Sequence, residues 1–121
     1  MLYIINQETS DSEIITFIAS YLKKYYPKIH FKTVKNSVDI ANIQHNTYFI
    51  INNNSNPKNY LKLAKKIRQK DKYGDIILIS KNINYQELFR SHITFFEVID
   101  DTQAPKTRIK ECIDFLYKGI Q

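Results

Sequence analysis

The sequence predicts an α/β protein with a five-stranded parallel sheet in the order 2-1-3-4-5 and helices on both faces. Residues 47–51 and 75–80 are short apolar runs that stop at polar residues, a pattern typical of strands buried on both faces of a parallel sheet. Amphipathic helical patterns alternate with these and three further strand-like segments. That alternation favours right-handed crossovers, which keep the strands parallel.

The segment 47–55 is the centre of the predicted sheet. Its apolar run, residues 48–51, leads directly into Asn52-Asn53-Asn54-Ser55. Asn56-Pro57 follows, and these residue types suit a helix N-cap and first helical position. In open α/β sheets, ligands bind where such strands end. We therefore expect a site after Ile50, built from residues that carry no charge.

Composition indicates one soluble domain over residues 1–121. The formal net charge is +6, compatible with an acidic partner, although the basic residues are spread along much of the chain. Cys112 is the single cysteine, so we expect no disulfide framework and no structural zinc site. No apolar run reaches the ~18–20 residues of a membrane span, and the N-terminus lacks the pattern of a signal peptide. We expect a cytoplasmic protein.

The first half of the chain predicts four elements before the central strand. Residues 2–6 form an interior strand, and Ser10 to Glu13 resembles a capping box with Ser10 as the N-cap. The helix that follows ends at Tyr26-Pro27. Residues 29–34 alternate with period two and predict an edge strand, and 37–43 predict a short helix. The inward stripe of the first helix is expected at Ile14, Phe17 or Ile18, Tyr21 or Leu22, and Tyr25.

The second half predicts three further helices and two strands. Residues 57–71 form a helix, 75–80 an interior strand, 85–93 a two-turn helix and 95–99 an edge strand. Pro105 begins the last helix, since proline suits a first helical turn. Helical spacing predicts that the helix 57–71 buries Tyr60, Leu63, Ala64 and Ile67. In the last helix it predicts a buried stripe at Ile109, Cys112 or Ile113, Leu116 and Ile120.

Three stretches carry a resemblance to a known family: Tyr48-Phe49, residues 63–79 (LAKKIRQKDKYGDIILI), and Asp100-Asp101 followed by Thr107-Arg108-Ile109 and Cys112. With the five β-α units, they resemble response-regulator receiver domains, closest to the Agr-type and competence-type LytTR-class regulators of low-GC Gram-positive bacteria. The resemblance covers the whole chain. It implies a flavodoxin-like (CheY-like) three-layer sandwich.

Receivers of this family use five positions around a phosphoryl group. An acidic pair holds Mg²⁺, an aspartate accepts the phosphoryl group, a hydroxyl reports it and a lysine neutralises its charge. The resemblance places these roles on the degenerate positions Gln7 and Glu8, Ile51 (or Asn52 if the register slips by one), Ser80 and Ile99. Lys81 follows a different strand. An isoleucine at position 99 suggests an apolar pocket in place of a charged one.

The resemblance therefore implies an atypical, phosphorylation-independent receiver domain of a LytTR-class transcriptional response regulator. No enzyme activity, metal or cofactor is expected. Such receivers commonly dimerise, or bind a partner protein, through the face of the fourth and fifth strands and their helices. DNA would be contacted only through a domain after Gln121, and no membrane contact is expected. Here that face would offer Leu88, Phe89, Arg90, Phe95, Phe96, Glu97 and Tyr117, with Phe115 beside them.

A second hypothesis is a small basic α/β nucleic-acid-binding protein. Its binding element would be the helix from Lys58 to Lys72, which carries the densest group of cations in the chain, and steep salt dependence would support it. Tyr60 is assigned to the core face, so the sequence offers no stacking platform there. An enzyme is a third hypothesis, but no nucleophile-base set and no glycine-rich phosphate loop nominates a reaction.

Overall fold

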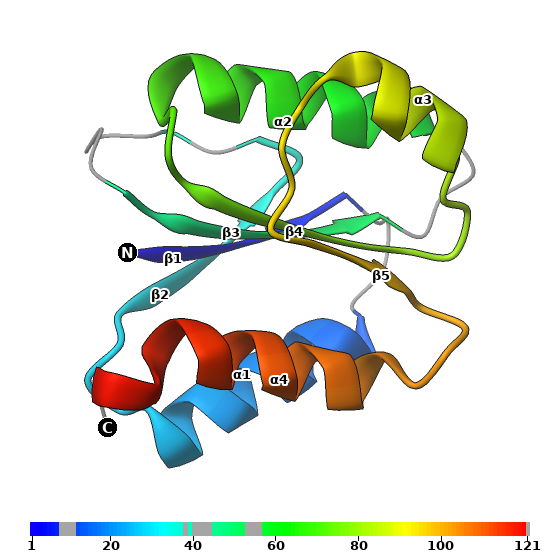
Figure 1. Ribbon diagram of the computed structural model, residues 1–121. Coiled ribbons are helices and arrows are strands. Elements are labelled where there is room, and N and C mark those ends of the chain that lie inside the picture. The colour runs from blue at the N-terminus through cyan, green and yellow to red at the C-terminus, as the bar shows by residue number, and fades with distance from the viewer. Residues whose placement is uncertain (8–11, 38, 40–44, 53–56, 121) are drawn as a thin grey trace.

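The computed structural model describes residues 1–7, 12–37, 39, 45–52 and 57–120 (Figure 1). The predicted helix 37–43 falls mostly outside these ranges, as does Glu8. None of the described helices is long and apolar enough to cross a membrane. In order, the elements are β1 (Leu2–Asn6), α1 (Glu13–Tyr25), β2 (Phe31–Lys35), β3 (Thr47–Asn52), α2 (Pro57–Lys70), β4 (Asp75–Ser80), α3 (Tyr85–Ser91), β5 (Glu97–Asp100), α4 (Pro105–Tyr117) and the 3₁₀ turn η1 (Lys118–Ile120).

The five strands form one parallel sheet in the order β2-β1-β3-β4-β5, which confirms the predicted flavodoxin-like fold. The helices α2 and α3 cover one face, and α1 and α4 cover the other (Figure 1). Successive strand residues point to opposite faces, so the sheet feeds two separate cores. Phe49 and Ile51 pack towards α1 and α4, whereas Tyr48 and Ile50 pack towards α2 and α3.

The central strand β3 is buried along its whole length and pairs with β1 on one side and β4 on the other. Phe49, Ile50, Ile77 and Leu78 are all fully buried, as their charge-free runs predicted. The outer strands differ. Strand β2 has no fully buried residue and β5 has one, which agrees with the prediction that both lie at edges.

Several predicted boundaries move by one to two residues. The N-cap of α1 is Ser12, whose Oγ accepts a hydrogen bond from the Ile14 N–H at 3.1 Å. The prediction that Ser10 is the N-cap is therefore wrong. Glu13 is the first residue of the helix and not the fourth residue of a capping box. Glu13 instead pairs with Lys106 of α4 at 2.6 Å. At the other end of α1, Tyr25 is exposed and Tyr26 is buried, because the chain leaves the helix there and turns Tyr26 inward.

Aromatic hydroxyls join α1 to α4 across the lower layer of the fold. The hydroxyls of Tyr21 and Tyr26 both donate to Asp114 Oδ1, at 2.7 and 2.6 Å. Burial and the Asp114 carboxylate raise the pKa of Tyr21 well above its ordinary value. Tyr117 continues this cluster, since its ring packs against Tyr26 and its hydroxyl is 2.5 Å from Thr47 Oγ1. The two helices are thus held by charge-assisted hydrogen bonds as well as by apolar packing.

A buried carboxylate organises the amino-terminal edge of the sheet. Asp71 is 1% exposed, and its Oδ2 accepts hydrogen bonds from the Asn46 N–H, the Asn46 side-chain amide and the Tyr48 hydroxyl at 2.9, 3.2 and 2.8 Å. Three donors satisfy a charge that burial alone would strongly disfavour. The partial negative charge at the carboxyl-terminal end of α2 disfavours an acidic residue there. The position of Asp71 directly after α2 is therefore the one sequence signal that this residue has another role.

Gly74 is required where this network meets the turn into β4. A Cβ atom added at Gly74 would lie 2.7 Å from both Asp71 Oδ2 and Tyr48 Cε2. We expect Gly74→Ala to lower the free energy of unfolding by about 1–3 kcal/mol, the usual cost of overpacking. Thermal or denaturant unfolding measures it. Gly119→Ala is the matched control, because an added Cβ meets nothing within 4 Å there; equal costs at both positions would contradict this account.

Alkaline pH should destabilise the fold through Tyr48. Burial, with Asp71 beside the hydroxyl, raises the pKa of Tyr48 above its ordinary value of 10.0. The Tyr48 hydroxyl therefore loses its proton at a lower pH in the unfolded chain than in the folded one. Its contribution to the free energy of unfolding is complete below pH ~10 and is lost as the pH rises further. Unfolding measured from about pH 8 to 11 should show a shallower decline in Tyr48→Phe than in the parent. Tyr85→Phe, at a side chain 60% exposed, should leave the decline unchanged.

Candidate functional site

The carboxyl-terminal edge of the sheet brings four polar positions into one row. Asn52 of β3 is in register with Ser80 of β4, and Ser80 is in register with Asp100 of β5. Gln7 follows β1, and its N–H donates to the Ile51 carbonyl at 2.9 Å. The ends of parallel strands thus place these side chains side by side, at the edge where open α/β sheets bind ligands.

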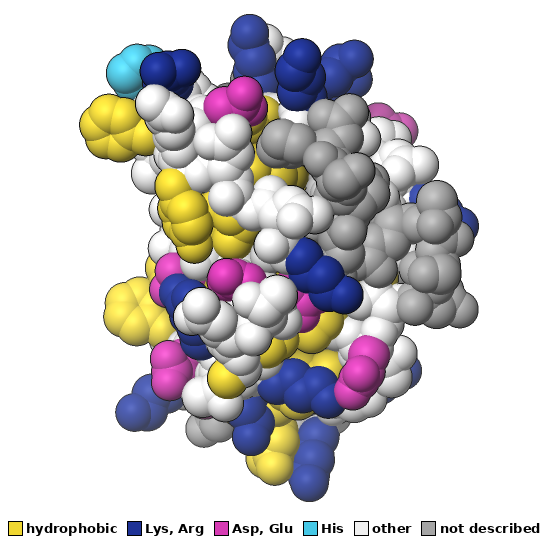
Figure 2. Space-filling view, turned by 90° about the vertical axis from the view of Figure 1, so that its right-hand side faces the viewer, with side chains coloured by type: hydrophobic (Ala, Val, Ile, Leu, Met, Phe, Trp, Pro, Cys, Tyr) yellow, Lys and Arg dark blue, Asp and Glu magenta, His cyan; other side chains and the backbone are white. Residues whose placement is uncertain are grey.

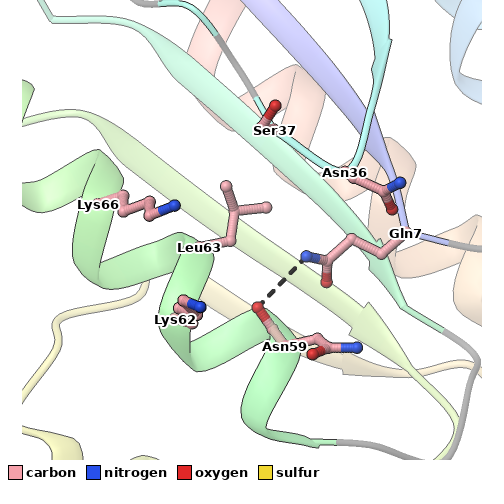
Figure 3. A pocket seen from close by; sticks show the side chains of 7 residues that line it. All are labelled: Gln7, Asn36, Ser37, Asn59, Lys62, Leu63 and Lys66. Carbon is pink, nitrogen blue, oxygen red and sulfur yellow. Dashed lines mark hydrogen bonds between the residues drawn. The ribbon is translucent and has the colours of Figure 1, made fainter.

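Side-chain amides link β1, β3 and α2 at this edge. The Asn52 Nδ2 group donates to Gln7 Oε1 at 2.8 Å, and the Gln7 Nε2 group donates to the Asn59 carbonyl at 3.3 Å (Figure 3). Asn52 is fully buried, and among the described residues its side-chain oxygen finds no hydrogen-bond partner. A chain of neutral amides therefore occupies the place where the resemblance would put carboxylates.

Strand register decides which residue of β3 faces this edge. Ile51 packs into the core beneath α1 and α4, together with Ile79 and Ile99. Asn52, one residue later, is the side chain that meets Gln7. The alternation of side chains along a strand makes the two positions exclusive. The polar position at the end of β3 is thus Asn52, and its amide cannot form an acyl phosphate.

The position assigned to the receiver lysine also lies in the core. Ile99 is fully buried and packs with Ile109 and Ile113 of α4, so it is part of a filled core and does not line the apolar pocket expected there. The residue that stands beside Ser80 is Asp100. Its Oδ1 accepts hydrogen bonds from the Thr102 N–H at 2.9 Å and the Thr102 hydroxyl at 2.7 Å, and these lower the pKa of Asp100. The edge gains a carboxylate where receivers have a cation.

Ser80 is fully buried and closes the turn after β4. Its Oγ accepts a hydrogen bond from the Asn82 N–H at 3.3 Å, while Lys81 is exposed. The sequence leaves two interpretations of this hydroxyl open, a vestigial switch or simply a polar strand end, and they differ in what the hydroxyl should contact. The bond to Asn82 is local to the turn, which favours the strand-end interpretation.

A pocket of about 260 Å³ opens beside the amide chain. Figure 3 shows Gln7, the residues that follow β2 and the side chains of α2 around the same space. Its lining combines amides, a hydroxyl and two ammonium groups, which suits hydrogen bonding to a polar or anionic group. Among the described residues no three His, Cys, Asp or Glu side chains are grouped to hold a metal ion. The lining residues are Gln7, Asn36, Ser37, Asn59, Lys62, Leu63 and Lys66.

The predicted interaction face is only partly exposed. Phe89 of α3 is 85% exposed and Phe115 of α4 is 78% exposed. Arg90 is exposed, and Phe95 and Phe96 are half-buried. Leu88 is 8% exposed and belongs to the core under α2 and α3, so it does not form part of that face.

Tyr117 is half-buried, and its ring packs against Tyr26, the residue that caps α1. Glu97 remains on the face and accepts a hydrogen bond from Arg108 Nη2 at 2.7 Å. Phe115 contacts Phe96, with ring centroids 5.6 Å apart. Rings and a charged pair therefore meet where α4 lies against β5.

The single cysteine and the three histidines are the remaining candidates. Cys112 is buried, and burial raises the pKa of its thiol to about 11, so it is a core residue and not a nucleophile. His45 pairs with Asp75 at 2.7 Å near the amino-terminal edge, a contact that the sequence did not predict. His30 and His92 are exposed.

The structure thus brings Gln7 and Asn52 together, places Ser80 and Asp100 beside them in register, and removes Ile51 and Ile99 to the core. Asp100 is the residue that sequence reasoning missed, and counting one position further along β5 would have found it. No family model, curated protein or solved structure gives a significant match to this chain.

Proposed function

We propose that this chain is a receiver-like interaction module that works without phosphorylation and pairs with a second copy of itself. The pairing surface is formed by α3, β5 and α4, and is called here the α3–β5–α4 face: Phe89, Arg90, Phe96, Glu97, Arg108 and Phe115. The observation that carries this proposal is the exposure of Phe89 and Phe115, the two most exposed large hydrophobic side chains in the described part of the chain.

Exposed aromatic rings favour an interface over a solvated surface. Two phenylalanines that expose most of their area leave apolar surface in water, and aromatic residues together with arginine are enriched at protein interfaces. Figure 2 shows hydrophobic side chains standing out along the left margin of the molecule, beside acidic and basic ones. Phe96 and Phe115 form a continuous apolar contact into which a partner's ring could pack.

The charges of this face support a second copy as the partner. The face carries both signs of charge, Arg90 and Arg108 with Glu97, and a two-fold axis would set the acidic group of one copy against the basic groups of the other. Strand β5 is also an edge of the sheet. In the LytTR-class regulators that the chain resembles, pairing of receivers brings two DNA-binding domains together, and we propose the same role here.

The residues at the carboxyl-terminal edge of the sheet support the proposal that the domain works without phosphorylation. Asn52 is an amide that is already bonded to Gln7, and the position of the receiver lysine is the buried Ile99. A charge arriving at β3 would find no cation at the position of the receiver lysine. The input that biases an ordinary receiver between two states is therefore missing, and packing or a partner sets the conformation.

Substitutions at the end of β3 test this account. Asn52→Asp should cost about 1–3 kcal/mol of stability, because it buries a carboxylate and removes the donor to Gln7. Ile51→Asp should cost more, on the order of 3–5 kcal/mol, because an unpaired charge enters the core. Thermal unfolding measures both, and Ile51→Val is the control, with an expected loss of about 0.5–1.5 kcal/mol.

The same variants test for a hidden phosphorylation switch. Acetyl phosphate or beryllium fluoride with Mg²⁺ should leave the amide resonances of Asn52, Ser80 and Asp100 unchanged in the parent, and the self-association of Asn52→Asp unchanged as well. Saturable shifts at these amides, or a phosphodonor-dependent dimer in either variant, would show that the switch is intact.

Charge placed on the aromatic rings tests the interface. Phe89→Glu and Phe115→Glu should each weaken self-association at least tenfold, since loss of an interface hot spot typically costs about 2 kcal/mol or more. Both side chains are exposed, so the free energy of unfolding should change by less than about 0.5 kcal/mol. Sedimentation over a range of concentrations gives the dissociation constants.

Tyr25→Glu is the control for this experiment, because Tyr25 is 45% exposed and lies on α1, outside the α3–β5–α4 face. It should leave self-association unchanged. Dimerisation that survives both phenylalanine substitutions, or a parent chain that remains monomeric at the highest concentrations, would refute pairing through the α3–β5–α4 face.

A further inference from the structure

The outer surface of α2 carries one sign of charge. Lys58, Lys62 and Lys65 recur at helical spacing and are all exposed, so they form one stripe on the helix face away from the core. No Asp or Glu occurs between Pro57 and Lys70. Figure 2 shows Lys and Arg side chains gathered at the top of the molecule, where α2 lies in Figure 1.

An aromatic groove lies at the carboxyl-terminal end of this stripe. Its volume is about 750 Å³, and its walls are the turn between α2 and β4 and the loop between α3 and β5. Tyr73 is 72% exposed, with the Lys72 ammonium 5.5 Å from its ring centroid. Phe95 and Phe96 line the opposite wall. All of these residues lie in the described part of the chain.

Arg68 holds the two walls of the groove at a fixed separation. Its Nη1 donates to the Gly74 carbonyl and its Nη2 to the Thr94 carbonyl, both at 2.6 Å. The acidic residue of the lining, Asp75, pairs with His45 at 2.7 Å. The groove is therefore shaped before any ligand arrives, and its lining carries two cations, Arg68 and Lys72, beside this one carboxylate.

We propose that α2 and this groove bind single-stranded nucleic acid, with phosphates along the Lys58–Lys62–Lys65 stripe and a base stacked on Tyr73. A lysine track that leads to an exposed aromatic ring is the combination by which proteins hold single strands. The 14 residues of α2 make a track about 21 Å long, enough for several successive phosphates. This function is separate from pairing through the α3–β5–α4 face.

Two features of the site favour single strands over other polyanions. A base reaches a groove wall only when it is unstacked, and bases in a duplex are not. An acidic polypeptide would satisfy the lysines but has no use for a ring paired with a cation. The aromatic platform missing at Tyr60, which is fully buried, is supplied by Tyr73 in the turn that follows α2.

Fluorescence anisotropy with an oligothymidylate of about 12 nucleotides, within the range of known single-strand sites, tests the proposal. Binding to the parent should weaken steeply between about 50 and 200 mM salt. A combined Lys58→Gln, Lys62→Gln and Lys65→Gln variant should lower the slope of log K against log salt by about 2. Tyr73→Ala should weaken binding about five- to hundredfold while leaving that slope unchanged.

Matched controls separate this site from general attraction to a basic protein. A combined Lys23→Gln, Lys28→Gln and Lys32→Gln variant removes the same number of charges from exposed positions elsewhere, and Tyr85→Ala removes another exposed ring. Both should bind like the parent, as should Phe89→Glu. Thermal unfolding should confirm that every variant is folded.

Any one of the following outcomes would overturn the proposal. One is equal losses in the two lysine variants, which would mean attraction by net charge alone. Another is unaltered affinity in Tyr73→Ala, or competition by polyglutamate as effective as by the oligonucleotide, which would assign the surface to an acidic polypeptide. The last is tighter binding of a duplex than of the single strand.

Discussion

Burial of β3 on both faces is the constraint on which the rest of this fold depends. The strand pairs with β1 and β4 and contributes to both cores, so a charged side chain anywhere inside it would be desolvated without a partner. Polar residues are accordingly confined to its ends, with Asn46 and Thr47 before the apolar run and Asn52 after it. Whatever chemistry the sheet performs has to take place at those two ends.

The two ends solve the problem of buried polarity differently. At the amino-terminal edge, a carboxylate, Asp71, receives three donors and fixes the turn into β4 through Gly74. At the carboxyl-terminal edge, the side-chain amides of Asn52 and Gln7 bond to each other, and the Asn52 side-chain oxygen has no hydrogen-bond partner among the described residues. The Asn52 amide cannot form an acyl phosphate, which an aspartate at the same position could.

The surfaces proposed for function lie away from the usual site of α/β proteins. Phe89 and Phe115 fall outside the buried stripes of their helices, and Tyr73 sits in a turn. None of them contributes to either core, so the fold does not require them to be aromatic. Exposing such rings to water is unfavourable in an isolated chain. This is the physical reason to assign them to contacts with other molecules. Phe96 lines the groove and also contacts Phe115, so the two proposed surfaces adjoin.

The sequence by itself determined the order of the elements, the parallel sheet and the choice of central and edge strands. These depend on local periodicity and on where apolar runs stop, and both are properties of neighbouring residues. The buried stripe of α2 followed from the same rule, and Tyr60, Leu63, Ala64 and Ile67 are all buried.

Only the tertiary structure decided the site. Whether Ile51 or Asn52 faces the strand ends depends on register, because a shift of one residue exchanges the two faces of a strand. The burial of Ile99 and Leu88 and the packing of Tyr117 against Tyr26 follow from contacts with distant elements. The partners of Asp71 lie 23 to 25 residues earlier in the chain, and no local pattern encodes contacts over that separation.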